Sequence, residues 1–185
     1  MKSQKAILLE TINELLGALE EEYNSGNQDT HPLNNTSLEN KNNEKLVYAA
    51  VQKYGFPLQY ASKELQDNKR IVLEAVSRCS GAYREFDNAL RYASERLKDD
   101  KEVVLKAIIA EPISLEYASK RLQDDKEVVL EALLMKDIME HGCFYMYYLP
   151  ALEFASQKLQ DDDDEVVAAA ISIVPESLEF ASKRL

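Results

Sequence analysis

The sequence predicts an all-α protein in which tandem helix pairs stack as a short solenoid. Three observations lead to this fold class: one stretch recurs along the chain, its apolar residues follow helical spacing, and an acidic turn divides each copy. One pair of helices cannot bury its apolar faces alone, so neighbouring copies must stack on one another. The copies occupy residues 58–76, 90–108, 115–133 and 152–171, and half a copy, LEFASKRL, occupies residues 178–185.

Residues 1–23 predict an amphipathic helix that precedes the repeats. Its apolar stripe recurs at spacings of four, three and four residues, and glutamates fill many positions between its members. Two interpretations remain open: the helix binds a partner or another copy of itself, or it folds back and caps the array. Barely two heptads are present, too few for a stable independent coiled coil, which favours the cap. The stripe consists of Leu8, Ile12, Leu15 and Leu19.

Residues 24–43 predict a flexible linker. Asn, Ser, Thr and charged residues dominate there, with Leu33 and Leu38 as the large apolar side chains. This composition cannot bury enough apolar surface to offset the entropy lost on ordering. The tandem repeats then extend over residues 44–185 and begin with a half unit, because LVYAAV at 46–51 aligns with IVLEAV of the next unit.

Each complete unit predicts two antiparallel helices joined by a short acidic turn. The turns fit a capping box, in which an Asp side chain accepts from the third amide of the helix and a Glu three positions later reaches back. In the first turn Asp67 is followed by Arg70 instead of Glu, so we expect this turn to be the weakest. The proposed pairs are Asp99 with Glu102, Asp124 with Glu127, and Asp162 with Glu165.

Comparison of the copies with one another separates packing from chemistry. The aromatic position alternates between Tyr and Phe, so its hydroxyl is dispensable and the ring packs. A serine two positions later recurs without a His or Lys base, and we interpret it as a small residue that lets helices approach closely. The two positions hold Tyr60, Tyr92, Tyr117, Phe154 and Phe180, and Ser62, Ser94, Ser119, Ser156 and Ser182.

Basic residues lie at the end of the first helix in most units, at Arg96, Arg121, Lys158 and Arg184. We expect them to complement the negative end of the helix dipole. A basic ladder that binds an acidic partner is the alternative, although Glu64 interrupts it.

The connection at residues 134–151 is longer than the repeat requires and gathers four aromatic rings. Tyr and Phe often anchor protein interfaces, and loops inserted into solenoids often carry binding specificity. We therefore predict a partner-binding site there; the alternative is that the rings fill a gap in the core. The predicted site residues are Phe144, Tyr145, Tyr147 and Tyr148.

Composition argues against several functions. The net charge of −11 disfavours nucleic acid and anionic membrane surfaces as partners, and no apolar run approaches the roughly 20 residues that span a bilayer. Cys79 and Cys143 lack zinc-site spacing and are expected to be reduced thiols. His31 and His141 each lack a second ligand at helical spacing. The sequence therefore predicts no cofactor, no metal site and no catalytic residue.

The pattern L-x-[YF]-A-S-x-x-L-x-D-[DN], followed by a helix of the type VVLEA, resembles the bacterial and protist repeat family called domain of unknown function 4116. The resemblance covers about residues 44–185. It implies an all-helical fold with no established activity and no catalytic residues to carry over. Because the family occurs in bacteria that live inside amoebae or other host cells, we expect an effector or a regulator of one. Such a protein acts in the cytoplasm or reaches a host cytosol without a classical signal peptide.

Together these features favour a non-enzymatic protein-interaction module whose partner and oligomeric state the sequence leaves open. The rival is an enzyme with its site in the concave face of the array. A buried cluster of titratable groups drawn from non-repeating positions would distinguish the enzyme from the interaction module.

Overall fold

The computed structural model describes residues 6, 7, 9–14, 17, 38–53, 56–78, 88–139, 151–161 and 163–173. Helices account for the regular secondary structure of these residues, which confirms the predicted all-α class. Near the N-terminus, residues 6, 7, 9–14 and 17 are helical. Leu8, Leu15 and Leu19 of the predicted apolar stripe lie outside the described residues.

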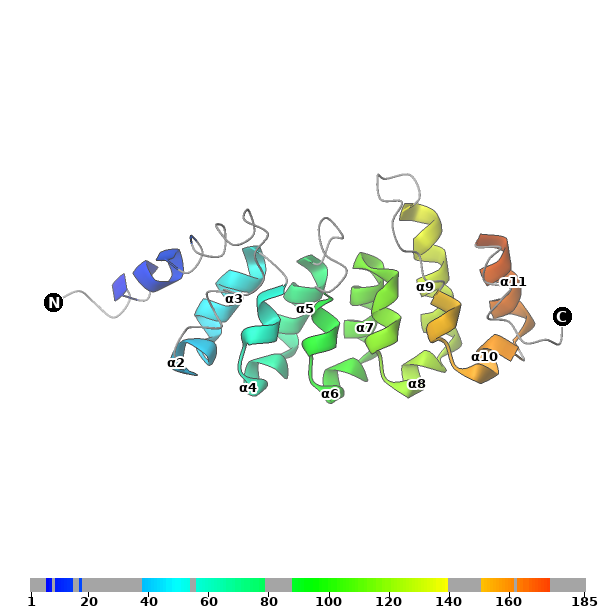
Figure 1. The fold of residues 1–185 in the computed structure, drawn as a ribbon, viewed down its shortest axis with the longest axis horizontal. Helices are drawn as coiled ribbons and strands as arrows, with labels where there is room; N and C mark the ends of the chain where they lie inside the picture. Colours follow the sequence, from blue (N-terminus) through cyan, green and yellow to red (C-terminus); the bar gives the residue numbers. More distant parts are fainter. Residues whose placement is uncertain are drawn as a thin grey trace.

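One order of elements recurs along the described chain: a 3-10 helix, a short α-helix and a long α-helix (Figure 1). The long helices are α3 (Glu44–Lys53), α5 (Lys69–Arg78), α7 (Lys101–Ala110), α9 (Lys126–Met139) and α11 (Asp164–Ile173). The short helices are α2 (Leu38–Lys41), α4 (Lys63–Gln66), α6 (Glu95–Lys98), α8 (Lys120–Gln123) and α10 (Gln157–Asp161). The 3-10 helices are η1 (Phe56–Tyr60), η2 (Ala89–Tyr92), η3 (Pro112–Tyr117) and η4 (Ala151–Phe154).

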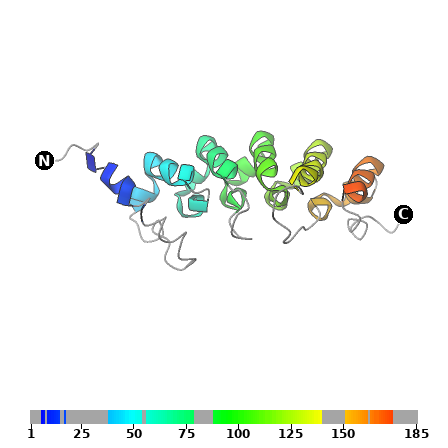
Figure 2. The same cartoon turned by 90° about the horizontal axis from the view of Figure 1, so that it is seen from above.

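The long helices run side by side in chain order (Figure 1). Helix α5 packs between α3 and α7, and α9 packs between α7 and α11. From above, the long helices form one layer, and the short helices with the 3-10 helices form a second layer (Figure 2). Each repeat therefore contacts the repeat before it and the repeat after it.

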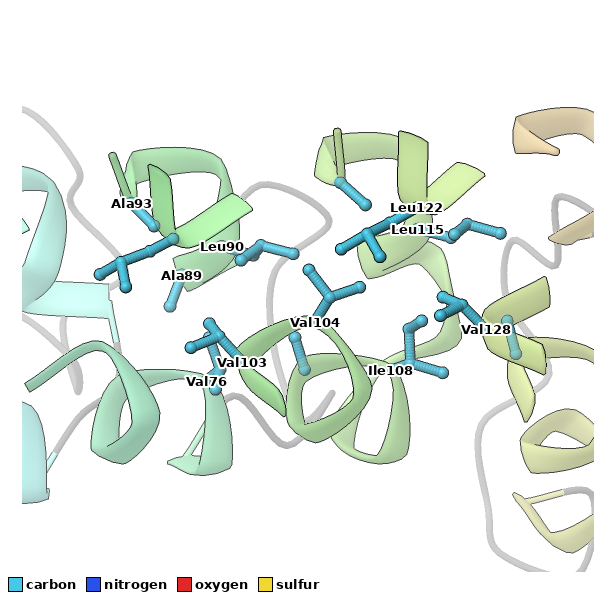
Figure 3. Close-up of a cluster of buried hydrophobic side chains, with 14 of the residues drawn as sticks. Val76, Ala89, Leu90, Ala93, Val103, Val104, Ile108, Leu115, Leu122 and Val128 are labelled. Carbon is cyan, nitrogen blue, oxygen red and sulfur yellow. The ribbon is translucent and has the colours of Figure 1, made fainter. Parts of the chain in front are cut away.

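The hydrophobic core lies between the two layers. Val104 and Ile108 of α7 lie on the side of Leu115 and Leu122 of the short-helix layer, and Val104 points toward these leucines, whereas Val103 lies on the side of the preceding repeat (Figure 3). All five side chains are fully buried, and each buried aliphatic side chain of this size stabilises a fold by about 1.5–3 kcal/mol. One continuous core cluster extends from the first long helix to the last. The predicted packing role of the aromatic position holds for Tyr92, Tyr117 and Phe154, which pack partly buried against this cluster.

The predicted first helix of each unit is not a single helix. In the unit of Ser119, the 3-10 helix η3 ends at Tyr117, and Ala118 and Ser119 adopt extended backbone with ψ of 158° and 154°. The Ser119 hydroxyl then accepts from the backbone N–H of Leu122 at 3.3 Å and begins α8. The recurring serine is an N-cap that divides the predicted helix in two, so its interpretation as a small packing residue was wrong.

The predicted linker ends earlier than expected. Its last part contains α2, and the carbonyl of Lys41 accepts from the backbone N–H of Ser62 at 3.0 Å. The Ser62 hydroxyl also donates to Asn42 Oδ1 at 2.7 Å. These bonds place Asn42 and Asn43 at the turn position of the later units, so the first unit is more complete than a half unit. Residues 24–37 lie outside the described residues.

Candidate interaction surfaces

The acidic turns between short and long helices line up along one edge of the array, which we call the turn edge. It comprises Asp67, Asn68, Asp99, Asp100, Asp124, Asp125 and Asp163, with the Ser, Arg and Lys side chains that bind them. Each turn has two acidic or amide positions with separate roles. Because the described positions of these turns share this arrangement, the turn edge repeats the same chemistry from unit to unit.

The second position of each turn is the N-cap of the long helix. Asp100 Oδ1 accepts from the backbone N–H groups of Glu102 at 3.1 Å and Val103 at 3.3 Å. Asn68, Asp125 and Asp163 cap their helices in the same way. The predicted caps at Asp67, Asp99, Asp124 and Asp162 were therefore placed one residue too early. The physical reason is that Asp99 is the C-cap of α6, with its backbone N–H bonded to the Glu95 carbonyl at 3.1 Å.

The first position of each turn binds the following unit. Asp99 Oδ1 accepts from the Ser119 hydroxyl and from Arg121 Nε, the latter at 3.0 Å, while Arg121 Nη2 donates to the Asp99 carbonyl at 2.8 Å. The Ser119 bond and then the Arg121 bond lower the pKa of Asp99. Asp67 accepts the equivalent bonds from Ser94 and Arg96 of the next unit. The Ser94 bond and then the Arg96 bond lower the pKa of Asp67.

These contacts revise the interpretation of the basic residues. Arg96 and Arg121 do compensate a helix C-terminus, but it is the C-cap of the short helix in the preceding unit. Their guanidinium groups are occupied by Asp67 and Asp99. The part of the predicted basic ladder formed by these two arginines therefore joins units within the chain.

A lysine at the start of each middle long helix makes a second link between units. Lys69 Nζ lies 2.7 Å from Asp100 and 2.8 Å from Glu102 of the next turn. Lys101 binds Asp125 and Glu127, and Lys126 binds Asp163 and Glu165, at 2.7–2.9 Å. The Lys69 bond is the main cause of the lowered pKa of Asp100, and the Asp100 bond is the main cause of the raised pKa of Lys69. The glutamates of the predicted capping boxes thus bind lysines of the preceding unit.

The first link has its charges exchanged. Glu44 begins α3 where later units have lysine, and it pairs at 3.6 Å with Arg70, which occupies the place of the glutamates. The Arg70 guanidinium also lies over the Tyr48 ring, 4.3 Å from its centroid. Arg70 therefore preserves the link between units instead of marking a defective cap.

Buried glutamines, which the sequence reasoning overlooked, tie the short helices to the 3-10 helices. Gln123 Nε2 donates to the carbonyls of Leu115 at 2.9 Å and Glu116 at 3.0 Å. Gln66 makes the same pair of bonds in its unit, and both glutamines are only 4% exposed. The signal was a glutamine directly before the first acidic residue of the turn.

The opposite side of the long helices, turned away from the short-helix layer, forms what we call the outer face. Equivalent positions near the ends of the long helices hold Gln52, Ser77, Ile109, Leu134 and Ser172. Ile109 of α7 is 48% exposed and Leu134 of α9 is 50% exposed, and these two helices are neighbours. A shallow depression of about 480 Å³ lies beside Leu134, lined also by Lys126, Glu127, Leu130 and Glu131. The outer face is thus apolar in two adjacent units and polar at the same position in others.

The predicted partner-binding residues Phe144, Tyr145, Tyr147 and Tyr148 lie outside the described residues, as do both cysteines and both histidines. Within the described ranges, no group of three or more His, Cys, Asp or Glu side chains could hold a metal ion. The same ranges contain no helix that is long and apolar enough to cross a membrane. Their buried polar side chains are Gln66, Asn88, Ser114 and Gln123.

Comparison with known proteins gives one finding. The family model described as Domain of unknown function (DUF4116) matches residues 43–91 and 82–120, which confirms the predicted resemblance. No curated protein and no solved structure matches the chain significantly. The two matched segments cover the turn edge from Asp67 to Ser119 and the helices α3, α5 and α7. The matched segments together span residues 43–120, less than half of the chain, and over this stretch the chain is similar to the DUF4116 family.

Proposed function

We propose that the chain is a short solenoid of stacked helix pairs that works as a protein-interaction module without enzymatic activity. The observation that carries this proposal is the exposed pair Ile109 and Leu134 on the outer face. An apolar side chain there is not required by the repeat, because Gln52, Ser77 and Ser172 occupy the same position elsewhere. Adjacent exposed apolar side chains in an otherwise polar position are typical of a surface that a partner covers.

The turn edge supports the proposal because its side chains hold the units together. Its Asp, Ser, Arg and Lys side chains are engaged in bonds between units, so they serve to hold the scaffold. A scaffold fixed along one edge presents the outer face as an ordered surface, which lowers the entropic cost of binding. The aromatic connection with Phe144, Tyr145, Tyr147 and Tyr148 stays a second predicted surface.

The N-terminal helix, the linker before residue 38 and the site of action, cytoplasmic or inside a host cell, stay predictions. An enzyme with an unrecognised site remains the rival. The described buried polar groups are amides and one hydroxyl, and Gln66, Asn88, Ser114 and Gln123 all hydrogen-bond within the fold. No described observation favours the enzyme over the interaction module.

A capture experiment with matched variants tests the proposal. The intact chain is immobilised beside Ile109→Ser with Leu134→Ser, which introduces the serine that α5 and α11 already carry, and beside Gln52→Ser as a control. A fourth variant changes Phe144, Tyr145, Tyr147 and Tyr148 to Ser. We expect the intact chain and the Gln52→Ser variant to capture a partner protein. The variant with Ile109→Ser and Leu134→Ser should fail to capture it. Loss in the aromatic variant alone would move the site to that connection.

Circular dichroism must first show that each variant keeps the helical content of the intact chain. If the captured partner protein, once purified, binds all the variants with equal affinity, it uses neither the outer face nor the aromatic connection. If the intact chain binds no protein, a second copy included, at concentrations up to about 200 μM, where weak micromolar complexes also form, the interaction module is rejected.

A further inference from the structure

We infer that the outer face of α7 and α9 binds the same face of a second copy of this chain, giving a two-fold dimer. The inference rests on the proposed function, because it names the partner of the surface formed by Ile109 and Leu134. A two-fold interface requires a patch that is complementary to itself. The outer face of α7 and α9 meets that requirement in its apolar side chains and in Lys106 and Glu131. Two further glutamates at equivalent positions, Glu102 and Glu127, are already paired with Lys69 and Lys101 of the preceding units.

The apolar side chains come in equivalent pairs. Ile109 and Leu134 occupy the same position of two adjacent repeats, and so do the partly buried Leu105 and Leu130 one turn earlier. α11 carries Ala168 and Ser172 at these positions, so the apolar patch does not continue onto the next helix. On the other side, α5 carries Leu73 at the position of Leu105 but the polar Ser77 at that of Ile109, so both positions are apolar together on α7 and α9. These are two neighbouring helices, which fits two neighbouring helices of another copy.

The charged side chains are complementary between the two repeats. Lys106 and Glu131 lie at equivalent positions, one residue after Leu105 and Leu130, and carry opposite charges. No ion pair joins either of them to another residue in the described part of the chain. Both are thus available to an opposite charge on a second molecule.

A two-fold axis in the plane of the outer face, parallel to α7 and α9 and midway between them, brings these groups together. It places α7 of one copy on α9 of the other, because rotation about that axis exchanges the two positions. Lys106 then faces Glu131 twice, and Ile109 faces Leu134 twice. A second copy thus supplies the opposite charge at both positions, which is the observation that favours it as the partner.

The size of the face predicts the strength of the dimer. α7 has 10 residues and α9 has 14, so the two helices are about 15 and 21 Å long and cover a face about 20 Å wide. Their projected area of about 400 Å² is smaller than the roughly 800 Å² that each partner buries in a standard interface. We therefore expect a reversible dimer with a dissociation constant in the micromolar range, about 1–100 μM.

Sedimentation velocity of the full chain over about 1–200 μM tests the inference. We expect the mass to rise from the 21.0 kDa monomer toward the dimer with concentration. Lys106→Glu and Glu131→Lys should each weaken the dimer by at least about tenfold, because each places like charges opposite one another twice. An equimolar mixture of these two variants should dimerise again, because the glutamate introduced into one variant then faces the lysine introduced into the other.

Lys45→Glu on α3 is the control for net charge, because it changes the total as Lys106→Glu does but lies on another helix. A chain that stays monomeric over the whole range, or a mixture that fails to regain the dimer, overturns the inference. A dimer that the single reversals leave unchanged also overturns it. If the intact chain is monomeric but captures another protein through Ile109 and Leu134, the inference fails while the proposed function stands.

Discussion

The turn edge and the outer face belong to the same helices but differ in what they repeat. Along the turn edge, Ser94 with Asp67 and Ser119 with Asp99 make the same contact in successive units. On the outer face, equivalent positions change from Gln52 and Ser77 to Ile109 and Leu134. A contact that recurs from unit to unit holds neighbouring units together. An apolar residue that replaces a polar one in only two adjacent units does not serve this purpose, which favours contact with another molecule.

The largest expected difference in stability is between a substitution in the core and one on the outer face. Leu122→Ala removes a fully buried side chain and should lower the free energy of unfolding by about 2–5 kcal/mol, since it leaves a cavity. Leu134→Ala truncates the same type of side chain at a half-exposed position and should lower the free energy of unfolding by less than about 1 kcal/mol. Urea unfolding followed by circular dichroism measures both. Equal costs would show that Leu134 is packed in solution and would remove the apolar patch from the outer face.

The recurring serine comes next. Ser119→Ala removes the N-cap bond to Leu122 and the bond to Asp99, and should destabilise the array by about 1–2 kcal/mol. Ser119→Thr keeps a hydroxyl at the cap and should cost clearly less. The same unfolding assay compares the two variants. A serine that acts only as a small residue would give the opposite order, with Ala tolerated and Thr destabilising.

The second acidic position separates capping from ion pairing. Asp100→Asn keeps an oxygen that can cap α7, as Asn68 does for α5, but weakens the bond with Lys69. It should cost less than about 1 kcal/mol, because the pair is partly exposed to water. Asp100→Ala also removes the cap and should cost about 1 kcal/mol more. If the two variants are equally destabilised, the cap at this position contributes nothing measurable.

The smallest effect is the dependence of stability on pH. The folded-state pKa values of Asp67, Asp99 and Asp100 are lowered, so their contribution is present above the unfolded value of about 3.9 and is lost as the pH falls through the lower folded values. We expect the free energy of unfolding to fall between about pH 5 and pH 2, and less steeply in Asp100→Asn. Urea titrations at fixed pH values measure this slope. An identical slope in the variant would show that Asp100 is not preferentially ionised in the folded state.

The lysines of the turn edge make stability depend on pH in the alkaline range. The raised pKa of Lys69 and Lys101 means that their contribution is complete below about pH 10 and declines as the pH rises through the raised values. The aspartates behind the acid slope and the lysines behind the alkaline slope all belong to the turn edge. Both slopes therefore report on the contacts that join one unit to the next.

The sequence predicted the core and the repeat but not the details of the joints. Leu115, Leu122 and Val128 are buried as their spacing indicated. The two adjacent aspartates at 99 and 100 gave no means of telling the C-cap of one helix from the N-cap of the next, because the capping-box template matches the first. The break before Ser119 was equally hidden, since its flanking apolar residues keep helical spacing across the interruption.

The outer face could not be derived from the pattern of apolar residues. Ile108 and Ile109 are adjacent and chemically alike, yet the first is fully buried and the second is half exposed. The direction of each depends on how α7 is rotated against its neighbours, which is set by tertiary contacts. Comparing Ile109 with Gln52 and Ser77 at the same position of other repeats would have indicated its exposure.

The polarity of the long helices has a consequence for engineering and for divergence of the chain. Each long helix begins at the turn edge and ends away from it, so the connections that follow Arg78 and Met139 leave from the far end. Chain length can change there without shifting any serine or lysine that joins one unit to the next. Grafted peptides should therefore be accepted at those two exits, whereas a single residue added between Leu97 and Asp100 would disrupt the register of two units at once.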